Sequence, residues 1–288
     1  MLMLDLLATA TSTPLYWSDL GLKPGIDLGF FTLRFYSLAY LAGILLGYWH
    51  LSKMVKAPGA PLAQRHADDL FFYCTLGIII GGRLGYATFY QRELWTSLDL
   101  FKLWEGGMSF HGGLIGTTLT IALVCWQGRL NFIRVCDYVA VNIGFGMLFG
   151  RLANFVNGEL WGRPAGADVP WAMIFPGGGM IARHPSQLYE AALEGALLIA
   201  VMLPLFWLTR ARFRTGLLVG TFVTLISAAR FTVEFFREPD AQLARFAMET
   251  GLNMGQWLTI PLMLLGLGLI GWSLRRPPLA SGKAPAAA

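Results

Sequence analysis

Two arginines in otherwise apolar parts of the sequence could bind an anion. Arg151 follows the apolar run 138–149, and Arg230 lies within another apolar segment. An arginine in hydrocarbon costs roughly 2.5–3.5 kcal/mol on insertion scales, so each side chain is expected to have a partner or a task. The planar guanidinium group matches the oxygens of a phosphate, and a phosphate at membrane depth belongs to a phospholipid. The two arginines therefore favour binding of an anionic lipid headgroup, with purely structural ion pairs as the alternative.

Three glutamates in apolar segments are the expected partners of these arginines. Glu190 and Glu194 are four residues apart and carry like charges, so we expect them to accept from arginines of neighbouring helices. Glu234 follows Arg230 by four residues, a spacing that lets the two side chains pair along one helix face. The alternative for this second pair is simple self-neutralisation.

One histidine lies in a setting that suits proton transfer. His111 is flanked by glycines in the stretch Gly106–Gly116 (GGMSFHGGLIG), which leaves backbone exposed beside the imidazole. Histidine titrates near neutral pH and is the commonest general base. The alternative is a histidine at a helix start that hydrogen-bonds to a carbonyl. The remaining histidines, His50, His66 and His184, show no metal-ligand spacing, and neither a metal nor another cofactor is expected.

The composition is typical of a membrane protein. Of the 288 residues, 55% are hydrophobic and only 14% are charged, whereas a soluble domain carries about 25% charged residues. The three cysteines form no CxxC pair, so the sequence does not indicate a disulfide framework or a thiolate metal site. In a membrane protein the net charge of +5 reflects topology, and we expect no nucleic-acid partner.

Apolar segments of about 20 residues recur along the chain, each long enough to cross a bilayer as a helix. We therefore expect an all-α polytopic membrane protein, with one transmembrane domain over residues 31–274. The long loop after the fourth helix, about residues 151–186, is expected to form a small head. Residues 1–30 are expected to form an interfacial arm, and residues 275–288 a disordered tail. The seven expected helices lie at residues 31–51, 69–90, 108–126, a stretch ending at 149, 187–208, 216–236 and 255–274.

The distribution of basic residues predicts the orientation of these helices. Seven spans sort the loops into two sets, and the set that includes the loops around Lys53, Arg129, Arg212 and Arg275 holds more lysines and arginines. By the positive-inside rule this set is cytoplasmic. The N-terminus and the loop after the fourth helix are then expected outside, and the C-terminus inside.

Four sequence blocks, found in order, resemble one known family, the bacterial phosphatidylglycerol–prolipoprotein diacylglyceryl transferases. Gly150–Gly162 fits the family signature G-R-x-[GA]-N-F-x-N-x-E-x-x-G at every fixed position. The other blocks are Gly107–Gly116, Arg183–Glu190 (RHPSQLYE) and Arg230–Asp240 (RFTVEFFREPD). The resemblance covers nearly the whole chain except the arm and the tail. It departs at Ile226, where some members carry a tyrosine.

This resemblance implies a multi-pass enzyme of the bacterial inner membrane, with seven helices and a periplasmic head. Such an enzyme moves the diacylglyceryl group of phosphatidylglycerol to the lipobox cysteine thiol of a prolipoprotein, forms a thioether and releases glycerol 1-phosphate. The implied partners are phosphatidylglycerol, the prolipoprotein signal peptide with its lipobox cysteine, and the surrounding membrane lipids. The N-terminus would be periplasmic and the C-terminus cytoplasmic.

The resemblance also implies which residues form the site. The expected catalytic residues are His111, Arg151, Arg230, Asn154, Glu159 and Glu234, and the expected phosphatidylglycerol-binding residues are Arg151, Arg230, Tyr36 and Gly162. We expect the two arginines to hold the phosphate and His111 to act as the base or to orient the thiol. We also expect Asn154 and Glu159 to fix the side chain of Arg151, and Glu234 to orient Arg230.

Two other classes of membrane protein could use these arginines. A transporter or flippase for an anionic lipid would use them as a transit site, but such proteins are typically built from inverted repeats, and the sequence shows no such symmetry. A purely structural membrane subunit would leave the outward-facing arginines unexplained.

Overall fold

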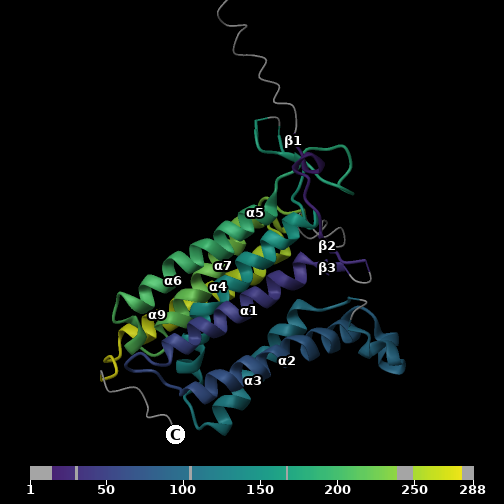
Figure 1. Cartoon of the computed structure of the whole chain (residues 1–288). Helices are drawn as coiled ribbons and strands as arrows, with labels where there is room; N and C mark the ends of the chain where they lie inside the picture. The colour runs from purple at the N-terminus through teal and green to yellow at the C-terminus, as the bar shows by residue number, and fades with distance from the viewer. Residues whose placement is uncertain (1–14, 30–31, 104–105, 167, 239–248, 281–288) are drawn as a thin grey trace, which may run out of the picture. The chain divides into compact units, whose positions relative to one another are not determined.

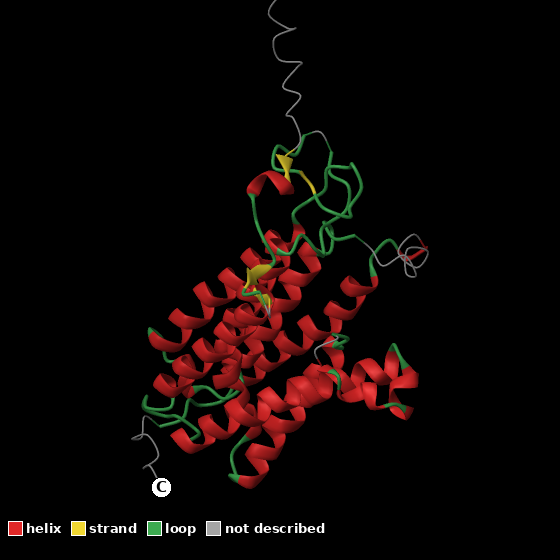
Figure 2. Ribbon diagram, turned by 45° about the vertical axis from the view of Figure 1, so that its right-hand side comes forward, coloured by secondary structure: helices red, strands yellow, loops and turns green. Residues whose placement is uncertain are grey.

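A computed structural model describes residues 15–29, 32–103, 106–166, 168–238 and 249–280 of the chain. Helices account for most of these residues, with a few short strands and several loops between them (Figure 2). Residues 1–14 of the expected arm and residues 281–288 of the expected tail lie outside the described residues.

The described residues contain seven helical segments of 17 residues or more (Figure 1), which coincide with the seven predicted helices. The fifth segment has three parts, because α5 continues through the π-helical turn η6 into α6. The segments are α1 (Phe35–Met54), α2 (Gln64–Phe89), α3 (Phe110–Gln127), α4 (Phe132–Val156), α5 (Ser186–Glu190) with η6 (Ala191–Ala196) and α6 (Leu197–Trp207), α7 (Leu217–Val233) and α9 (Met254–Leu274).

Within the described residues, three of these segments are long and apolar enough to cross a membrane. They are α2, the segment from Ser186 to Trp207, and α9. Helix α4 would be a fourth if its two parts, which are bent by 43° between Ala140 and Ile143, form one span. The chain is therefore a mostly helical membrane protein.

The fourth helix ends later than the sequence predicts. We expected an end near residue 149, whereas α4 continues to Val156. The apolar pattern explains the extension, because Leu152, Ala153 and Phe155 continue it past Gly150. Arg151 thus lies near the end of a helix instead of in a loop.

The chain divides into two compact units. The first consists of residues 1–43, 144–201 and 222–267, and the second of residues 44–143, 202–221 and 268–288. Each of α1, α4, α6, α7 and α9 contributes residues to both units.

In the first unit, the N-terminal arm packs with the loop that follows α4. Strand β1 (Leu15–Tyr16) pairs in parallel with β4 (Met173–Ile174), with Leu15 opposite Met173. The next residue, Trp17, is buried with Met173 and Phe175, and its indole nitrogen donates to the carbonyl oxygen of Phe155 at 2.8 Å. The arm and the predicted head thus share one small hydrophobic core. A second pair of strands, β2 (Gly25–Asp27) and β3 (Thr32–Arg34), leads antiparallel into α1.

Glycines allow the helices of the first unit to approach closely around α4. A Cβ atom on Gly43 of α1 would lie 2.8 Å from the Cα of Gly146. A Cβ atom on Gly195 of η6 would lie 2.6 Å from the Cα of Leu148. Close packing at Gly146 depends on Gly43, since a Cβ atom on Gly146 itself, like one on Gly150, would meet nothing within 4 Å.

In the second unit, α2 and α3 lie side by side (Figure 1). Two pairs of glycines at four-residue spacing, Gly77/Gly81 and Gly112/Gly116, face each other across this contact. A Cβ atom on Gly77 would lie 2.8 Å from the carbonyl oxygen of Gly116, and one on Gly81 would overlap the carbonyl oxygen of Gly112. These four glycines therefore allow the two helices to pack closely.

We expect Gly116→Ala to destabilise the protein, because the new methyl group would overlap the carbonyl oxygen of Gly77. Overpacking of this kind costs about 1–3 kcal/mol and should lower the thermal unfolding midpoint in detergent micelles. Gly113→Ala is the matched control, since its methyl group would lie 3.6 Å from the carbonyl oxygen of Ile78, an ordinary contact. A Gly116→Ala midpoint equal to or above that of Gly113→Ala would contradict the close packing.

Candidate active site

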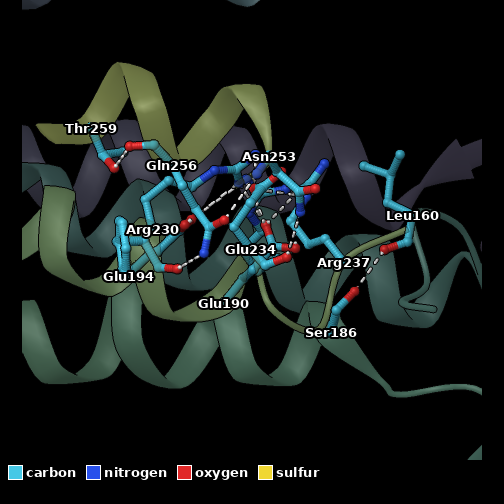
Figure 3. A network of polar contacts seen from close by, with 12 residues as sticks. Leu160, Ser186, Glu190, Glu194, Arg230, Glu234, Arg237, Asn253, Gln256 and Thr259 are labelled. Carbon is cyan, nitrogen blue, oxygen red and sulfur yellow. Dashed lines mark hydrogen bonds and ion pairs between the residues drawn. The ribbon is translucent and has the colours of Figure 1, made fainter. Parts of the chain in front are cut away.

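The carboxylate of Glu190 is the centre of a group of ion pairs in the first unit (Figure 3). Its side chain has no exposed surface. Glu190 Oε2 lies 2.7 Å from Arg151 Nη2 and 3.6 Å from Arg230 Nη1. Arg237 Nη1 donates to both carboxylate oxygens, at 3.1 and 3.2 Å. One buried carboxylate therefore holds three guanidinium groups.

Two further glutamates complete this arrangement. Glu194 lies 3.5 Å from Arg151 Nη2 and 3.6 Å from Arg230 Nη1. Glu234 lies 3.3 Å from Arg230 Nη2 and 3.7 Å from Arg237 Nε. The prediction that Glu190 and Glu194 accept from arginines elsewhere in the fold is confirmed, as is the Arg230–Glu234 pair. We call the six residues the arginine–glutamate cluster: Arg151, Arg230, Arg237, Glu190, Glu194 and Glu234.

The backbone around the cluster explains how six long side chains converge. Glu190 directly precedes the π-helical turn η6 and Glu194 lies within it, and such turns are frequent at functional sites. The close contact between Gly195 and Leu148 brings this turn against α4, which carries Arg151. Gly255 leaves room for the carboxylate of Glu234, because a Cβ atom there would lie 2.8–3.0 Å from its atoms.

The start of α9 also fixes the end of α7. The side chain of Asn253 donates to the carbonyl oxygen of Glu234 at 3.1 Å, and that of Gln256 donates to the carbonyl oxygen of Phe231 at 3.3 Å (Figure 3). The last carbonyls of a helix have no partner within the helix, so these two amides satisfy groups that would otherwise be orphaned. They thereby hold the backbone that carries Arg230 and Glu234.

The cluster is electrically asymmetric. The side chains of Glu190 and Glu194 are 0% and 1% exposed, whereas those of Arg151, Arg230 and Arg237 are 20%, 28% and 23% exposed. Among the described residues, every ion pair of Arg151 is made through Nη2, so its Nε and Nη1 remain for another acceptor. The accessible part of the cluster is therefore made of guanidinium donors, which suits an anion.

Arg237 is the cluster member that the sequence analysis missed. It directly follows the predicted end of the sixth helix at residue 236, where a basic residue usually belongs to a loop. Its spacing of three residues from Glu234 was the available signal. In the structure the backbone at Arg237 forms a β-bridge with Gly162, and Phe236 accepts from the backbone nitrogen of Arg163 at 3.0 Å. The head loop therefore positions this third arginine.

Gly162, a predicted substrate-binding residue, has a clear packing role. Its backbone nitrogen donates to the carbonyl oxygen of His184 at 2.9 Å. A Cβ atom at this position would overlap the carbonyl oxygen of Phe236 and lie 2.8 Å from that of His184. Only glycine lets the two backbone segments pass so closely.

Asn154 and Glu159 contact each other, and the structure gives Arg151 different partners from those we expected. The buried amide of Asn154 donates to Glu159 Oε1 at 2.9 Å. Arg151 pairs with Glu190 and Glu194 instead, because α4 continues through residue 156 and directs Arg151 toward the fifth helical segment.

The turn after α4 is also tied to α5. Gln187 donates to the carbonyl oxygen of Glu159 at 2.7 Å, and Ser186 donates to that of Leu160 at 3.2 Å (Figure 3). Leu160 has a φ of +56°, a conformation that costs a residue with a side chain about 1–3 kcal/mol. The two bonds from α5 hold this strained turn in place.

Tyr36 also belongs to the first unit. Its hydroxyl lies 3.1 Å from that of Tyr40, and it is close enough to Arg151 and Glu159 for both charges to act on it. The first unit thus contains all the predicted site residues except one.

The exception is His111, which belongs to the second unit. It is the second residue of α3, two residues after the N-cap Ser109, whose hydroxyl accepts from the backbone nitrogen of Gly112. The imidazole is exposed and packs edge-to-face on Phe110. In the described part of the chain, no group of three or more His, Cys, Asp or Glu side chains could hold a metal ion.

The helices and the cluster define an integral membrane protein with a site suited to an anionic group. The sequence model of the family "Prolipoprotein diacylglyceryl transferase" matches residues 25–272, and the chain belongs to this family. It is 64% identical to a phosphatidylglycerol–prolipoprotein diacylglyceryl transferase of Erythrobacter litoralis, over 98% of this chain and 100% of that protein. It is 48% identical to the enzyme of the same name from Zymomonas mobilis, over 91% of this chain and 94% of that protein.

We expect Glu190→Gln to destabilise the protein strongly, because it removes the charge that three guanidinium groups share. Breaking a buried ion pair by removing one partner costs about 3–5 kcal/mol, which should lower the thermal unfolding midpoint in micelles. Glu238→Gln is the control, since Glu238 pairs with Arg183 at 2.7 Å but is 44% exposed. Exposed pairs contribute about 0–1 kcal/mol, so equal effects of the two variants would contradict the central role of Glu190.

Proposed function

We propose that this chain is a transferase that moves the diacylglyceryl group of phosphatidylglycerol to prolipoproteins. The observation that carries the proposal is the cluster of three partly exposed arginines held by buried glutamates. The names of the relatives state the same lipid, acceptor and transferred group. The phosphodiester of phosphatidylglycerol is an anion carried at membrane depth, which is what such a cluster can bind.

The reaction is a displacement at the carbon of the diacylglyceryl group that is bonded to the phosphate oxygen. The sulfur of the lipobox cysteine forms a bond to this carbon, and the bond between the carbon and the phosphate oxygen breaks. Glycerol 1-phosphate leaves with the electron pair, and the product is a thioether. The singly charged phosphodiester becomes a monoester with a further negative charge, so donors at the phosphate stabilise the transition state more than the ground state.

The arginines bind the phosphate and stabilise the charge that develops on it. Arg151 and Arg230 are the main donors, and Arg237 is a third. Glu234 orients Arg230, since the two side chains are 3.3 Å apart. Asn154 and Glu159 hold the turn after α4, and Gly162 holds the segment that carries Arg237. Tyr36 completes the lipid-binding site from α1.

His111 accepts the proton of the cysteine thiol. A free cysteine has a pKa of about 8.5, so only a few per cent is thiolate at neutral pH and a base increases the reactive fraction. The exposed imidazole at the start of α3 is accessible to a peptide substrate. No metal or other cofactor takes part, because a phosphate ester is already a competent leaving group.

The enzyme spans the bacterial inner membrane seven times, with a periplasmic N-terminus and head and a cytoplasmic C-terminus. The pairing of β1 with β4 supports this topology. Paired strands lie on one side of a membrane, so the chain between them crosses an even number of times, as α1 to α4 do. The Gly162–Arg237 bridge likewise supports an even number of crossings by the two helical segments between these residues. With α9 as the last crossing, the C-terminus lies on the opposite side from the N-terminus.

The product assay tests the proposed reaction and the role of Arg151. Purified protein is incubated with phosphatidylglycerol and a lipobox peptide, and mass spectrometry detects the diacylglyceryl group on the cysteine. We expect Arg151→Ala to reduce the rate by about 10²–10³-fold, the usual effect of removing a donor at a developing charge. The control is Arg163→Ala, an exposed arginine of the head, which should retain the wild-type rate.

A normal rate for Arg151→Ala would contradict the phosphate-binding role. A wild-type protein that moves phosphatidylglycerol between leaflets without modifying the peptide would instead be a lipid transporter.

The pH dependence of the rate tests His111. We expect kcat/KM of the wild type to rise with pH as the general base loses its proton, because only the neutral form accepts a proton. His111→Gln should lose this rise and about 10²–10⁴-fold in rate. A pH profile that His111→Gln leaves unchanged would remove His111 from the proton-transfer step.

A further inference from the structure

Arg83 is a buried arginine on α2 whose hydrogen bonds, within the described residues, all go to one stretch of backbone. Its residue is 5% exposed. The guanidinium group donates to four carbonyl oxygens, those of Asp99, Leu100, Gly106 and Gly107. Nε lies 2.8 Å from the oxygen of Leu100, and Nη1 lies 3.2 Å from that of Gly107. All four acceptors lie in the connection between α2 and α3. A snorkelling side chain would instead place its charge in water.

The connection that Arg83 holds is partly exposed. It contains the short 3-10 helix η4 (Leu98–Phe101), whose Leu98 and Phe101 are 81% and 70% exposed. Gly106 and Gly107 have φ angles of +83° and +77°, which are conformations of a turn. The guanidinium group joins two parts of this connection, η4 and the glycine turn, to α2.

The glycine turn is shaped around the arginine. A Cβ atom on Gly107 would lie 2.6 Å from the ring of Tyr86 and 2.9 Å from Arg83 Nη1. A side chain at this position would therefore push the carbonyl groups away from the guanidinium group. Arg83 can reach these carbonyl groups because Gly107 has no side chain.

The turn leads directly to the residue proposed as the base. Ser109 lies two residues after Gly107. Its backbone N–H donates to the carbonyl oxygen of Gly82, the residue before Arg83, at 2.8 Å. The hydroxyl of Ser109 then caps α3, and His111 is the second residue of that helix. The glycine contacts of α2 and α3 place the body of α3, whereas Arg83 and Gly82 place its first turn.

We infer that Arg83 is a positioning residue for His111, acting through the backbone of residues 99–100 and 106–109. The functional half of this inference rests on the proposed role of His111. The structural half, that the guanidinium group holds the connection, stands on its contacts alone. Lysine cannot replace it, because one ammonium group cannot reach carbonyl oxygens spread over two parts of the connection.

Hydrogen exchange tests the structural half. Arg83→Gln and Arg83→Lys, each in lipid nanodiscs, should increase amide exchange in residues 97–103 and 106–109 by at least tenfold, while exchange in the second half of α3 stays within twofold. Arg92→Gln is the matched control, because Arg92 is an exposed arginine of the same connection. Unchanged exchange in residues 97–103 and 106–109 of Arg83→Gln would overturn the inference.

A double-mutant cycle tests the functional half, with the peptide-modification assay as readout. We expect Arg83→Gln to lower kcat by 10–100-fold while KM for phosphatidylglycerol changes by less than threefold. If Arg83 acts through His111, the double variant Arg83→Gln/His111→Gln should be no slower than His111→Gln alone. Losses that multiply in the double variant, or a loss carried by KM, would overturn the inference.

The same cycle separates this inference from the proposed function. Wild-type activity of His111→Gln would refute the role of His111 and with it the functional half. In that case the exchange experiment would still support or refute the hold of Arg83 on the connection.

Discussion

Three guanidinium groups share one carboxylate that has no contact with solvent, and the organisation of the first unit depends on this sharing. A buried charge is tolerated only where it is paired and hydrogen-bonded, so Glu190 has to receive Arg151 from α4 and both Arg230 and Arg237 from the end of α7 and the residues after it. The same requirement keeps the arginines in fixed positions before any lipid arrives. Fixed donors need no reorganisation when charge develops on a phosphate, which is the condition for strong electrostatic catalysis.

Residues without side chains make this convergence possible. Gly195 lets the turn that carries Glu194 touch α4, Gly255 leaves space for the carboxylate of Glu234, and Gly162 lets the head loop reach the backbone next to Arg237. In the second unit, glycines bring α2 and α3 together and Gly107 admits the guanidinium group of Arg83. In both units, backbone segments approach each other closely at glycines, and this approach lets the guanidinium groups reach their carboxylate or carbonyl oxygens.

The sequence predicts the helices well because length and hydrophobicity are local properties. It also predicts the partners of Glu190 and Glu194, since like charges in an apolar segment require cations from elsewhere. It does not predict that Arg237 joins them, because a basic residue after a helix end is usually a loop residue. The expected link from Asn154 and Glu159 to Arg151 was wrong, because α4 runs past its predicted end and changes the direction of Arg151. The packing of the arm against the head joins residues far apart in the chain, which local patterns do not encode.

The pairing of β1 with β4 has a consequence for how the chain is made. Leu15 can pair with Met173, and Trp17 can bond to Phe155, only after the helices between them have been synthesised. This synthesis takes about 8–30 s at about 5–20 residues per second. During that time the arm has no native partner. It can close only if its partners emerge on its own side of the bilayer, so a chain in which one of the intervening helices failed to insert would leave Trp17 without its site. The small hydrophobic core around Trp17 would therefore form only in a correctly inserted chain.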